Sequence, residues 1–180
     1  MQACLVMLLL SLSATDRAEE ICTTVSETWM MQHVPDKPLA IGVCRRAVAF
    51  SILMDLDPYV IAATLWEESR YDAAAKNGNG SARGELQVKV FWCKGKTFTD
   101  CDLTLAGLQA LQLLKTCAHK DWTNLTCRKR FRRPKTWRYT LCHYNDGNVC
   151  ASEHQHYVSS IVNNARFIRS RHKKRMRKQG

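Results

Sequence analysis

Residues 57–71, DPYVIAATLWEESRY, decide the fold that we predict for this chain. Asp57 can cap a helix, and Pro58 suits the first turn, because proline fixes φ and lacks an N–H that this turn would leave unpaired. Apolar side chains over residues 59–66 occupy almost the whole circumference, a pattern typical of a helix buried on all sides. We therefore expect a central helix that ends close to the carboxylate of Glu68.

Other stretches favour further helices around this one. The segment from residue 75 to 84 is rich in glycine and asparagine and is expected to be a loop, with strand signals confined to a short hairpin around residues 78–88. The predicted fold class is mainly α: a single domain with at most a short β-hairpin. Breaker residues and apolar spacing place its other helices at residues 19–32, from the Asp36-Lys37-Pro38 break through Met54, at 105–119, near Tyr139 to Asp146, and from Ser152 to about Arg169.

Cysteine is heavily used, with nine residues in a chain of 180. None forms the C-x-x-C pair of a zinc ribbon or a thioredoxin-like site, so disulfides and an oxidising compartment are favoured. Cys4 lies in the opening apolar run, and its removal would leave an even number. His154 and His156 face different ways in a helix, so we expect no metal site. The sequential pairing is one hypothesis among many: Cys22 with Cys44, Cys93 with Cys101, Cys117 with Cys127, and Cys142 with Cys150.

The chain opens with an apolar run, residues 3–12, which has the length of a secretory signal peptide and is too short to span a bilayer. Small residues up to Ala14 offer a cleavage site, but no Lys or Arg precedes the run, and a buried N-terminal helix is the alternative. We divide the chain into a signal peptide (1–18), one domain (19–168) and a basic C-terminal tail (169–180). The tail is expected to be mobile. The prediction is an exported protein with no transmembrane span in its mature form.

Lys and Arg outnumber Asp and Glu by 27 to 16, and most of this excess lies in two runs, 128–138 and 166–178, that contain no acidic residue. Such runs favour contact with a polyanion: nucleic acid, an anionic membrane surface or an anionic polymer of a bacterial envelope. A solvated, solubilising tail is the alternative for the second run. Nucleic acid is the least favoured partner, because no base-reading element is visible and the cysteines argue against a cytosolic role.

Two motifs stand in the order and at the separation of a known family. The first is ESRY at residues 68–71, followed after the loop by GELQ at residues 84–87, and the second is YNDG at residues 144–147. Together they resemble the soluble lytic transglycosylases and goose-type lysozymes, whose pattern is Glu-Ser, an aromatic residue, a loop, Gly-Leu-Met-Gln, and later Tyr-Asn before a glycine. The resemblance covers roughly residues 40–165. The matching residues are Glu68, Ser69, Tyr71, Ala82, Gly84, Gln87, Tyr144, Asn145 and Gly147.

The resemblance implies a lysozyme-like fold, which the predicted disulfides would staple, and cleavage of the MurNAc–GlcNAc β-1,4 bond of peptidoglycan by Glu68, without metal or cofactor. A glycosidic oxygen is a poor leaving group, so its cleavage needs a carboxylic acid that stays protonated near neutral pH. Desolvation and the negative end of the helix dipole both favour the protonated form of Glu68. In the family's transglycosylases the same glutamate then removes a proton, and the substrate's own N-acetyl and 6-hydroxyl groups produce a 1,6-anhydro-MurNAc end.

The substrate-binding candidates also come from the resemblance. Tyr144 would support the N-acetyl group of the sugar, although a core aromatic is the alternative. Gln87 and Asn145 would hydrogen-bond the substrate or order the loop, and Ser69 is the remaining candidate. Glu67, beside the catalytic candidate, is expected to belong to a solvated helix face.

No obvious second carboxylate accompanies Glu68, since the candidate aspartates lie past the helix end or in loops: Asp72, Asp100, Asp102 and Asp146. This absence favours transglycosylation over hydrolysis by a goose-type lysozyme, which is the nearest alternative. Glu85 and Leu86 stand where the family has Leu and Met, and they give weight to a catalytically inactive wall-binding or virion structural protein. We expect an exported monomer that acts on peptidoglycan glycan strands, with the basic runs on anionic envelope polymers.

Overall fold

The structure, a computed structural model, describes residues 2–119, 137–146 and 155–179. Within those ranges most residues are helical, and a two-stranded antiparallel sheet pairs Ala82 with Lys89 and Arg83 with Val88. The prediction of a mainly α single domain with a short hairpin is confirmed. The elements in chain order are α1 (Gln2–Ser26), α2 (Trp29–Gln32), α3 (Lys37–Leu53), α4 (Pro58–Ser69), β1 (Ala82–Arg83), β2 (Val88–Lys89), η1 (Val90–Cys93), α5 (Leu103–His119), α7 (Trp137–Asp146) and α8 (Gln155–Gln179).

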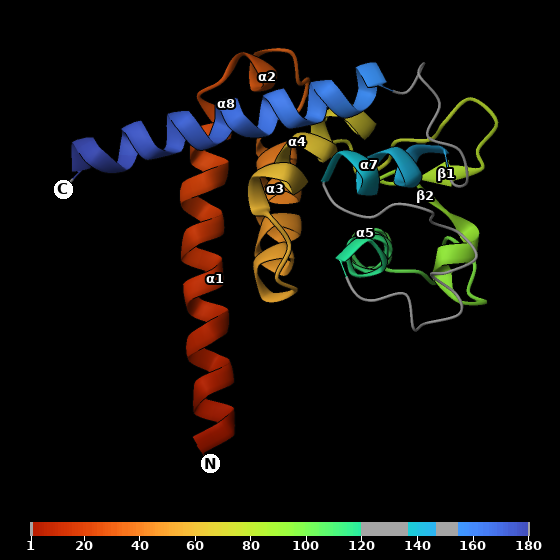
Figure 1. Cartoon of the computed structure of the whole chain (residues 1–180), viewed down its shortest axis with the longest axis horizontal. Coiled ribbons are helices and arrows are strands. Elements are labelled where there is room, and N and C mark those ends of the chain that lie inside the picture. The colour runs from red at the N-terminus through yellow and green to blue at the C-terminus, as the bar shows by residue number, and fades with distance from the viewer. Residues whose placement is uncertain (1, 120–136, 147–154, 180) are drawn as a thin grey trace.

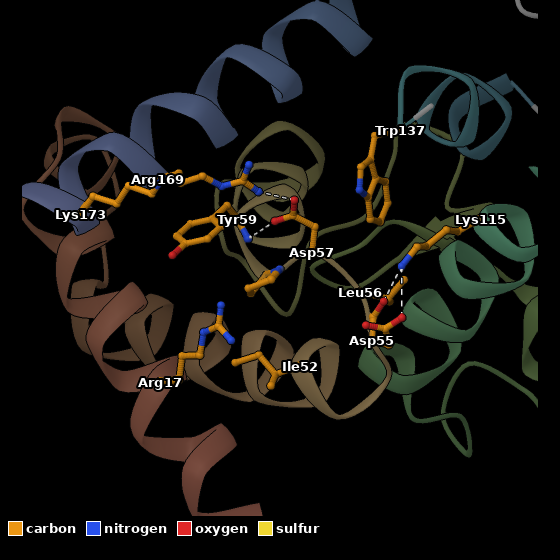
Figure 2. A pocket seen from close by; sticks show the side chains of 11 residues that line it. Arg17, Ile52, Asp55, Leu56, Asp57, Tyr59, Lys115, Trp137, Arg169 and Lys173 are labelled. Atoms are coloured by element: carbon orange, nitrogen blue, oxygen red, sulfur yellow. Dashed lines mark hydrogen bonds and ion pairs between the residues drawn. The ribbon is translucent and has the colours of Figure 1, made fainter. Parts of the chain in front are cut away.

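The helix α4 is central, as expected from its apolar circumference. Every side chain from Pro58 to Trp66 is buried, and the helix packs against α3 and α8 (Figure 1). The Asp57 carboxylate accepts the backbone N–H of Tyr59 at 3.1 Å and also pairs with Arg169 of α8 (Figure 2). The predicted N-cap therefore forms, and it also links the start of α4 to a second helix.

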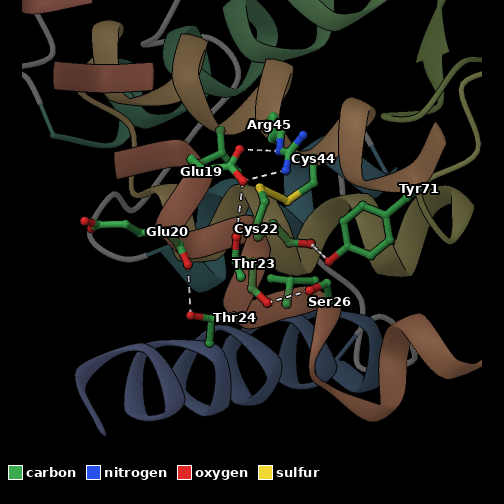
Figure 3. Close-up of a disulfide and its surroundings, with 12 residues drawn as sticks. Glu19, Glu20, Cys22, Thr23, Thr24, Ser26, Cys44, Arg45 and Tyr71 are labelled. Atoms are coloured by element: carbon green, nitrogen blue, oxygen red, sulfur yellow. Dashed lines mark hydrogen bonds and ion pairs between the residues drawn. A yellow bond between two sulfur atoms is a disulfide. The ribbon is translucent and has the colours of Figure 1, made fainter. Parts of the chain in front are cut away.

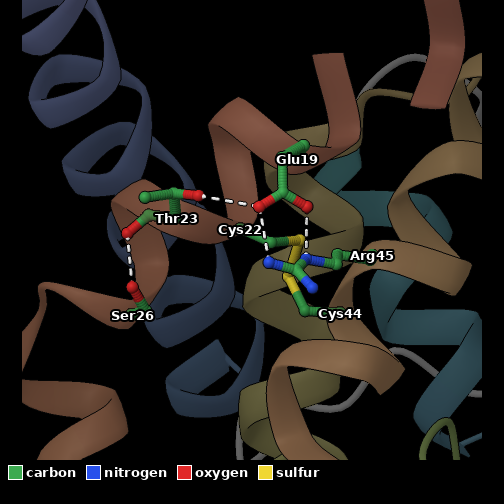
Figure 4. A network of polar contacts seen from close by, with 6 residues as sticks. All are labelled: Glu19, Cys22, Thr23, Ser26, Cys44 and Arg45. Carbon is green, nitrogen blue, oxygen red and sulfur yellow. Dashed lines mark hydrogen bonds and ion pairs between the residues drawn. A yellow bond between two sulfur atoms is a disulfide. The ribbon is translucent and has the colours of Figure 1, made fainter. Parts of the chain in front are cut away.

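The helices α1 and α3 pack against each other and are joined by the disulfide between Cys22 and Cys44 (Figure 3). Beside this disulfide, Glu19 of α1 pairs with Arg45 of α3 (Figure 4). A covalent bond and an ion pair thus hold the same helix pair together. The N-terminal part of α1 extends away from the rest of the described structure (Figure 1).

Two of the four hypothesised disulfides are confirmed, Cys22–Cys44 and Cys93–Cys101. Cys142 is also disulfide-bonded. The hypothesised pairs 117 with 127 and 142 with 150 include residues outside the described part of the chain and stay predictions.

The expected cleavage region lies within α1, where Ala14 and Ala18 are both buried. The division of the chain after residue 18 therefore falls inside a continuous helix and stays a prediction. Among the described residues, no helix is both long enough and apolar enough to cross a bilayer.

The last helix does not end near Arg169, as predicted, but continues to Gln179. His172 extends the inward stripe of this helix and is buried, with its Nδ1 2.8 Å from the hydroxyl of Tyr59. Arg175 pairs with Glu27 at the end of α1. The prediction of a mobile tail was wrong over the described residues, because contacts with α1 and α4 hold these basic turns in the fold.

Close backbone packing holds the hairpin against α5. Gly84 has a φ of +78°, and a Cβ there would lie 2.9 Å from the side chain of Leu103. A Cβ on Gly107 of α5 would lie 2.7 Å from the side chain of Leu86. Glycine at these two positions lets the loop between the strands sit directly on the helix.

Candidate active site

The end of α4 is fixed by the two residues that follow it. Arg70 and Tyr71 both have left-handed backbone conformations, with φ of 58° and 65°. The ring of Tyr71 is buried, and its hydroxyl donates a hydrogen bond to the carbonyl of Ala62 at 2.8 Å. The guanidinium of Arg70 lies 4.0 Å from the ring centroid of Trp66. The chain is thus anchored on α4 itself, immediately after the turn that carries Glu68.

The environment of Glu68 favours its protonated form. Burial raises the pKa of this carboxyl from the ordinary 4.5 to about 7, and the nearby negative charge of Glu67 adds to that rise. The hydroxyl of Tyr157 in α8 donates a hydrogen bond to Glu68 Oε1, which opposes the rise in its pKa. Within the described residues, no Lys or Arg forms an ion pair with this carboxylate. Glu68 can therefore both donate and accept a proton near neutral pH.

Two tyrosines from different helices lie at this carboxyl. Burial raises the pKa of Tyr144 and of Tyr157 well above the usual tyrosine value, and the charge of Glu68 adds to both shifts. Both hydroxyls therefore stay protonated. Tyr144 of α7 donates its hydrogen bond to the carbonyl of Leu86 at 2.7 Å, which ties α7 to the hairpin. The contact of Tyr157 with Glu68 was not foreseen from the sequence.

The GELQ loop between β1 and β2 is held by its own side chains and by α5. Gln87 has a φ of 48°, and its Nε2 donates to the carbonyl of Gly84 at 2.9 Å. In this structure Gln87 orders the loop, which was one of its two predicted roles. Glu85 is buried, accepts a hydrogen bond from the hydroxyl of Thr104, and contributes to the raised pKa of Tyr144. The position that departs from the family pattern is thus a second carboxylate close to Tyr144.

Glu67 does not lie on a solvated face, and that prediction was wrong. Its side chain is partly buried and accepts hydrogen bonds from Ser160 and Asn164 of α8, the latter at 3.1 Å. The helix α8 covers this end of α4, which the sequence of α4 alone does not reveal. Ser69 donates to the carbonyl of Leu65 at 3.1 Å within the same helix, and Asn145 is partly buried in α7.

The candidate aspartates have partners elsewhere. Asp72 accepts the backbone N–H of Ala74 at 2.8 Å, and Asp100 accepts the hydroxyl of Thr97 at 2.6 Å. Asp102 pairs with Arg46 at 2.7 Å. The side chain of Asp146 lies outside the described residues, as do His154 and Gly147. Of the described carboxylates, Glu67 and Glu85 are the ones that interact electrostatically with the Glu68 and Tyr144 cluster.

A pocket of about 660 Å³ lies at the opposite end of α4 (Figure 2). It is lined by the start of α4 and by residues from α1, α3, α5, α7 and α8. Two of its cations already have acidic partners: Arg169 pairs with Asp57, and Lys115 lies 3.8 Å from Asp55. This pocket is therefore separate from Glu68, and its charges are partly neutralised.

Comparison of the chain with protein-family models, with curated proteins and with solved structures finds no match. The resemblance to the lytic transglycosylases therefore stays a prediction from the sequence motifs.

Proposed function

We propose that the protein is an exported peptidoglycan lytic transglycosylase with Glu68 as its acid and then its base. The observation that carries the proposal is a carboxyl with a pKa of about 7 at the end of a buried helix, hydrogen-bonded by Tyr157 and without a cationic partner among the described residues. That is the protonation behaviour that glycosidic cleavage requires of its acid. The ESRY, GELQ and YNDG motifs carry the resemblance to the lytic transglycosylases. The disulfides are compatible with an extracellular location.

In the proposed reaction, protonated Glu68 gives its proton to the oxygen that links C1 of MurNAc to GlcNAc as that bond breaks. The carbonyl oxygen of the substrate's N-acetyl group stabilises the positive charge at C1. The 6-hydroxyl of the same sugar then bonds to C1, and its proton passes to the Glu68 carboxylate. Water is not consumed, the product ends in 1,6-anhydro-MurNAc, and the acid is regenerated. The hydroxyl of Tyr157 stabilises the carboxylate between the two steps.

The remaining residues would position the sugar and the loop. Tyr144 would support the N-acetyl group, and its bond to Leu86 fixes the ring for that task. Gln87 keeps the loop in a compact conformation, while Asn145 and Ser69 are the other proposed substrate contacts. No step needs a metal or a cofactor.

Hydrolysis by the same acid is the second candidate function, and Glu85 is the observation that favours it. Hydrolysis needs a base to take a proton from the attacking water, and a second carboxylate often fills that role. Glu85 is a buried carboxylate close to Tyr144. The hydrogen bond from Thr104 holds the Glu85 carboxylate towards α5, so transglycosylation remains the favoured function.

The test is to incubate the oxidised protein and its Glu68→Gln variant with purified peptidoglycan and to analyse the released fragments by mass spectrometry. The proposal predicts fragments whose muramic ends lack one water, released by the wild type and absent with the variant. Reducing ends would identify a hydrolase instead, and Glu85→Gln would then be the next variant. If the folded wild type binds the wall and releases nothing, the enzyme proposal is overturned.

A further inference from the structure

The C-terminal turns of α8 present a strongly cationic surface. The helix, Gln155–Gln179, contains eight Lys and Arg and no Asp or Glu. Two of the eight are occupied, since Arg169 pairs with Asp57 and Arg175 pairs with Glu27. The other six are exposed and form no ion pair within the described residues. We call these six the α8 cationic surface: Arg166, Arg171, Lys173, Lys174, Arg177 and Lys178.

The core fixes the direction of this surface. The inward side of α8 is buried through the stripe that runs from Val158 to His172. The exposed cations lie outside this stripe, and two of them that are four residues apart lie about 6 Å apart along the helix. Lys173 and Arg177 form one row, and Lys174 and Lys178 form the next. In Figure 1 the last turns of α8 project past α1.

A groove adjoins these cations. It has a volume of about 440 Å³ and lies between the end of α1 and the last turns of α8. Five of its lining residues are Lys or Arg, against one acidic residue, Glu27, which is already paired. The positive charge thus continues from a convex helix surface into a concave one.

We propose that the α8 cationic surface binds the linear phosphodiester polymers of a bacterial envelope. This inference rests on the proposed function, since it assumes that the protein works at the wall. Arginine matches phosphate oxygens with two parallel N–H bonds, and lysine adds point charge. Cations that repeat in two rows along a rigid helix suit a partner that carries phosphates along its length.

A bilayer and a nucleic acid fit these observations less well. A helix that lies on a membrane inserts an apolar face, but the apolar face of α8 is buried in the core. On its last turns, the exposed large hydrophobic residue is Met176, at 37%. The disulfides favour an oxidising compartment, which argues against intracellular nucleic acid as the partner.

The surface is far enough from Glu68 for both to be occupied at once. Tyr157, which contacts Glu68, and Lys178 lie on the same helix, about 30 Å apart at a rise of 1.5 Å per residue. One polymer can therefore hold the protein on the wall while a glycan strand lies at the acid.

The experiment is cosedimentation of the oxidised Glu68→Gln protein with two preparations of the same purified walls. One preparation keeps its covalently attached poly(glycerol phosphate), and hydrofluoric acid has removed that polymer from the other. The Glu68→Gln background prevents cleavage, so the assay reports binding whether or not the protein is an enzyme. The test variant adds Lys174→Gln, Arg177→Gln and Lys178→Gln.

A matched control removes the same charge elsewhere. It adds Lys89→Gln, Lys94→Gln and Lys96→Gln, three exposed lysines near the hairpin, at the other end of the molecule from the C-terminus (Figure 1). Because they lie on the side of the candidate active site, this control also reports any contribution of the hairpin to wall binding.

We expect the parent protein to bind phosphate-bearing walls on the order of tenfold more tightly than stripped walls, with the test variant losing that preference and the control keeping it. The slope of log affinity against log salt should fall by about 2 on loss of three phosphate contacts. Equal binding of the parent protein to both wall preparations would overturn the proposal, whatever the variants do. Tighter binding to DNA or to anionic lipid vesicles than to phosphate-bearing walls would also overturn the proposal, and would identify nucleic acid or the membrane as the partner.

Discussion

The two ends of α4 each carry a carboxylate, and the two groups have different neighbours. At the first end, Asp57 accepts a helix N–H and pairs with Arg169, at the positive end of the helix dipole. At the last end, Glu68 is largely desolvated, receives one neutral hydroxyl from Tyr157 and has negative Glu67 beside it. The first arrangement stabilises a charge, whereas the second disfavours one.

The helix α8 causes both differences, because it runs antiparallel to α4. Its Arg169 lies at the start of α4, and its Tyr157 lies at the end. A cation and a hydroxyl, placed three turns apart on one helix, thus turn one carboxylate into a structural cap and the other into a candidate acid. The partner helix therefore determines what each carboxylate can do, and substitutions at either end of α4 test this.

The largest expected effect is on catalysis. Glu68→Gln should lower the rate of fragment release from peptidoglycan on the order of 10²- to 10⁴-fold, because an amide cannot donate the proton. Asp57→Asn is the matched change at the other end of α4 and should leave the rate within a few-fold of the wild type. Equal losses in both variants would mean that Glu68 acts through the fold. Circular dichroism and initial rates on the same samples separate these cases.

The second effect is on stability, and its sign follows from the raised pKa of Glu68. The pKa is about 7 in the folded protein and 4.5 ordinarily, so the folded state binds more protons between these values. Stability contributed by this group is therefore lost as the pH rises from about 4.5 to about 7. Glu68→Gln removes that dependence, and its advantage over the wild type should grow by ~3 kcal/mol between about pH 4 and about pH 8. Urea unfolding at the two pH values measures the difference.

If the advantage of Glu68→Gln does not change with pH, the carboxyl is ionised in the folded protein at neutral pH. The environment of Glu68 would then not favour its protonated form, and the contrast between the two ends of α4 would disappear.

Much of this arrangement could be predicted from the sequence where local rules decide. The cap at Asp57, the burial of residues 58–66 and the loop before GELQ follow from capping, periodicity and glycine content. Glu68 could be singled out because the motif and the helix end coincide.

The sequence did not predict the contacts between α8 and the rest of the chain. Glu67 was predicted to be solvated because nothing in the sequence of α4 indicates that Ser160 and Asn164 hydrogen-bond to it. The basic turns after Arg169 were predicted to be a mobile tail because the residues that they contact lie on α1 and α4, far away in sequence. His172 stands four residues after Ile168 and continues the spacing of the buried residues Ile161, Ala165 and Ile168. This spacing was the signal that could have predicted a longer helix.

A smaller effect is expected at the structural end of α4. Asp57→Ala removes both the N-cap and the pair with Arg169, and should lower the free energy of unfolding by about 1–2 kcal/mol. Asp57→Asn keeps a capping oxygen and should cost less than half of that. Thermal and denaturant unfolding of both variants measure the costs. Should Asp57→Asn prove as harmful as Asp57→Ala, the ion pair would outweigh the cap.

The smallest effect tests the hydroxyl at the other end. Tyr157→Phe removes the hydrogen bond that opposes the rise in the pKa of Glu68, so that pKa should increase further. Because the protonated acid is the active form, the alkaline limb of the pH–rate profile should move to higher pH while activity at acidic pH is largely retained. Tyr144→Phe is the control, since its hydroxyl bonds to Leu86 and leaves the Glu68 hydrogen bond intact. A limb that stays in place in Tyr157→Phe, or moves equally in Tyr144→Phe, would mean that burial alone sets the proton affinity of Glu68. At this end of α4, α8 would then act only by burying Glu68. It would supply a functional side chain only at the other end, where Arg169 pairs with Asp57.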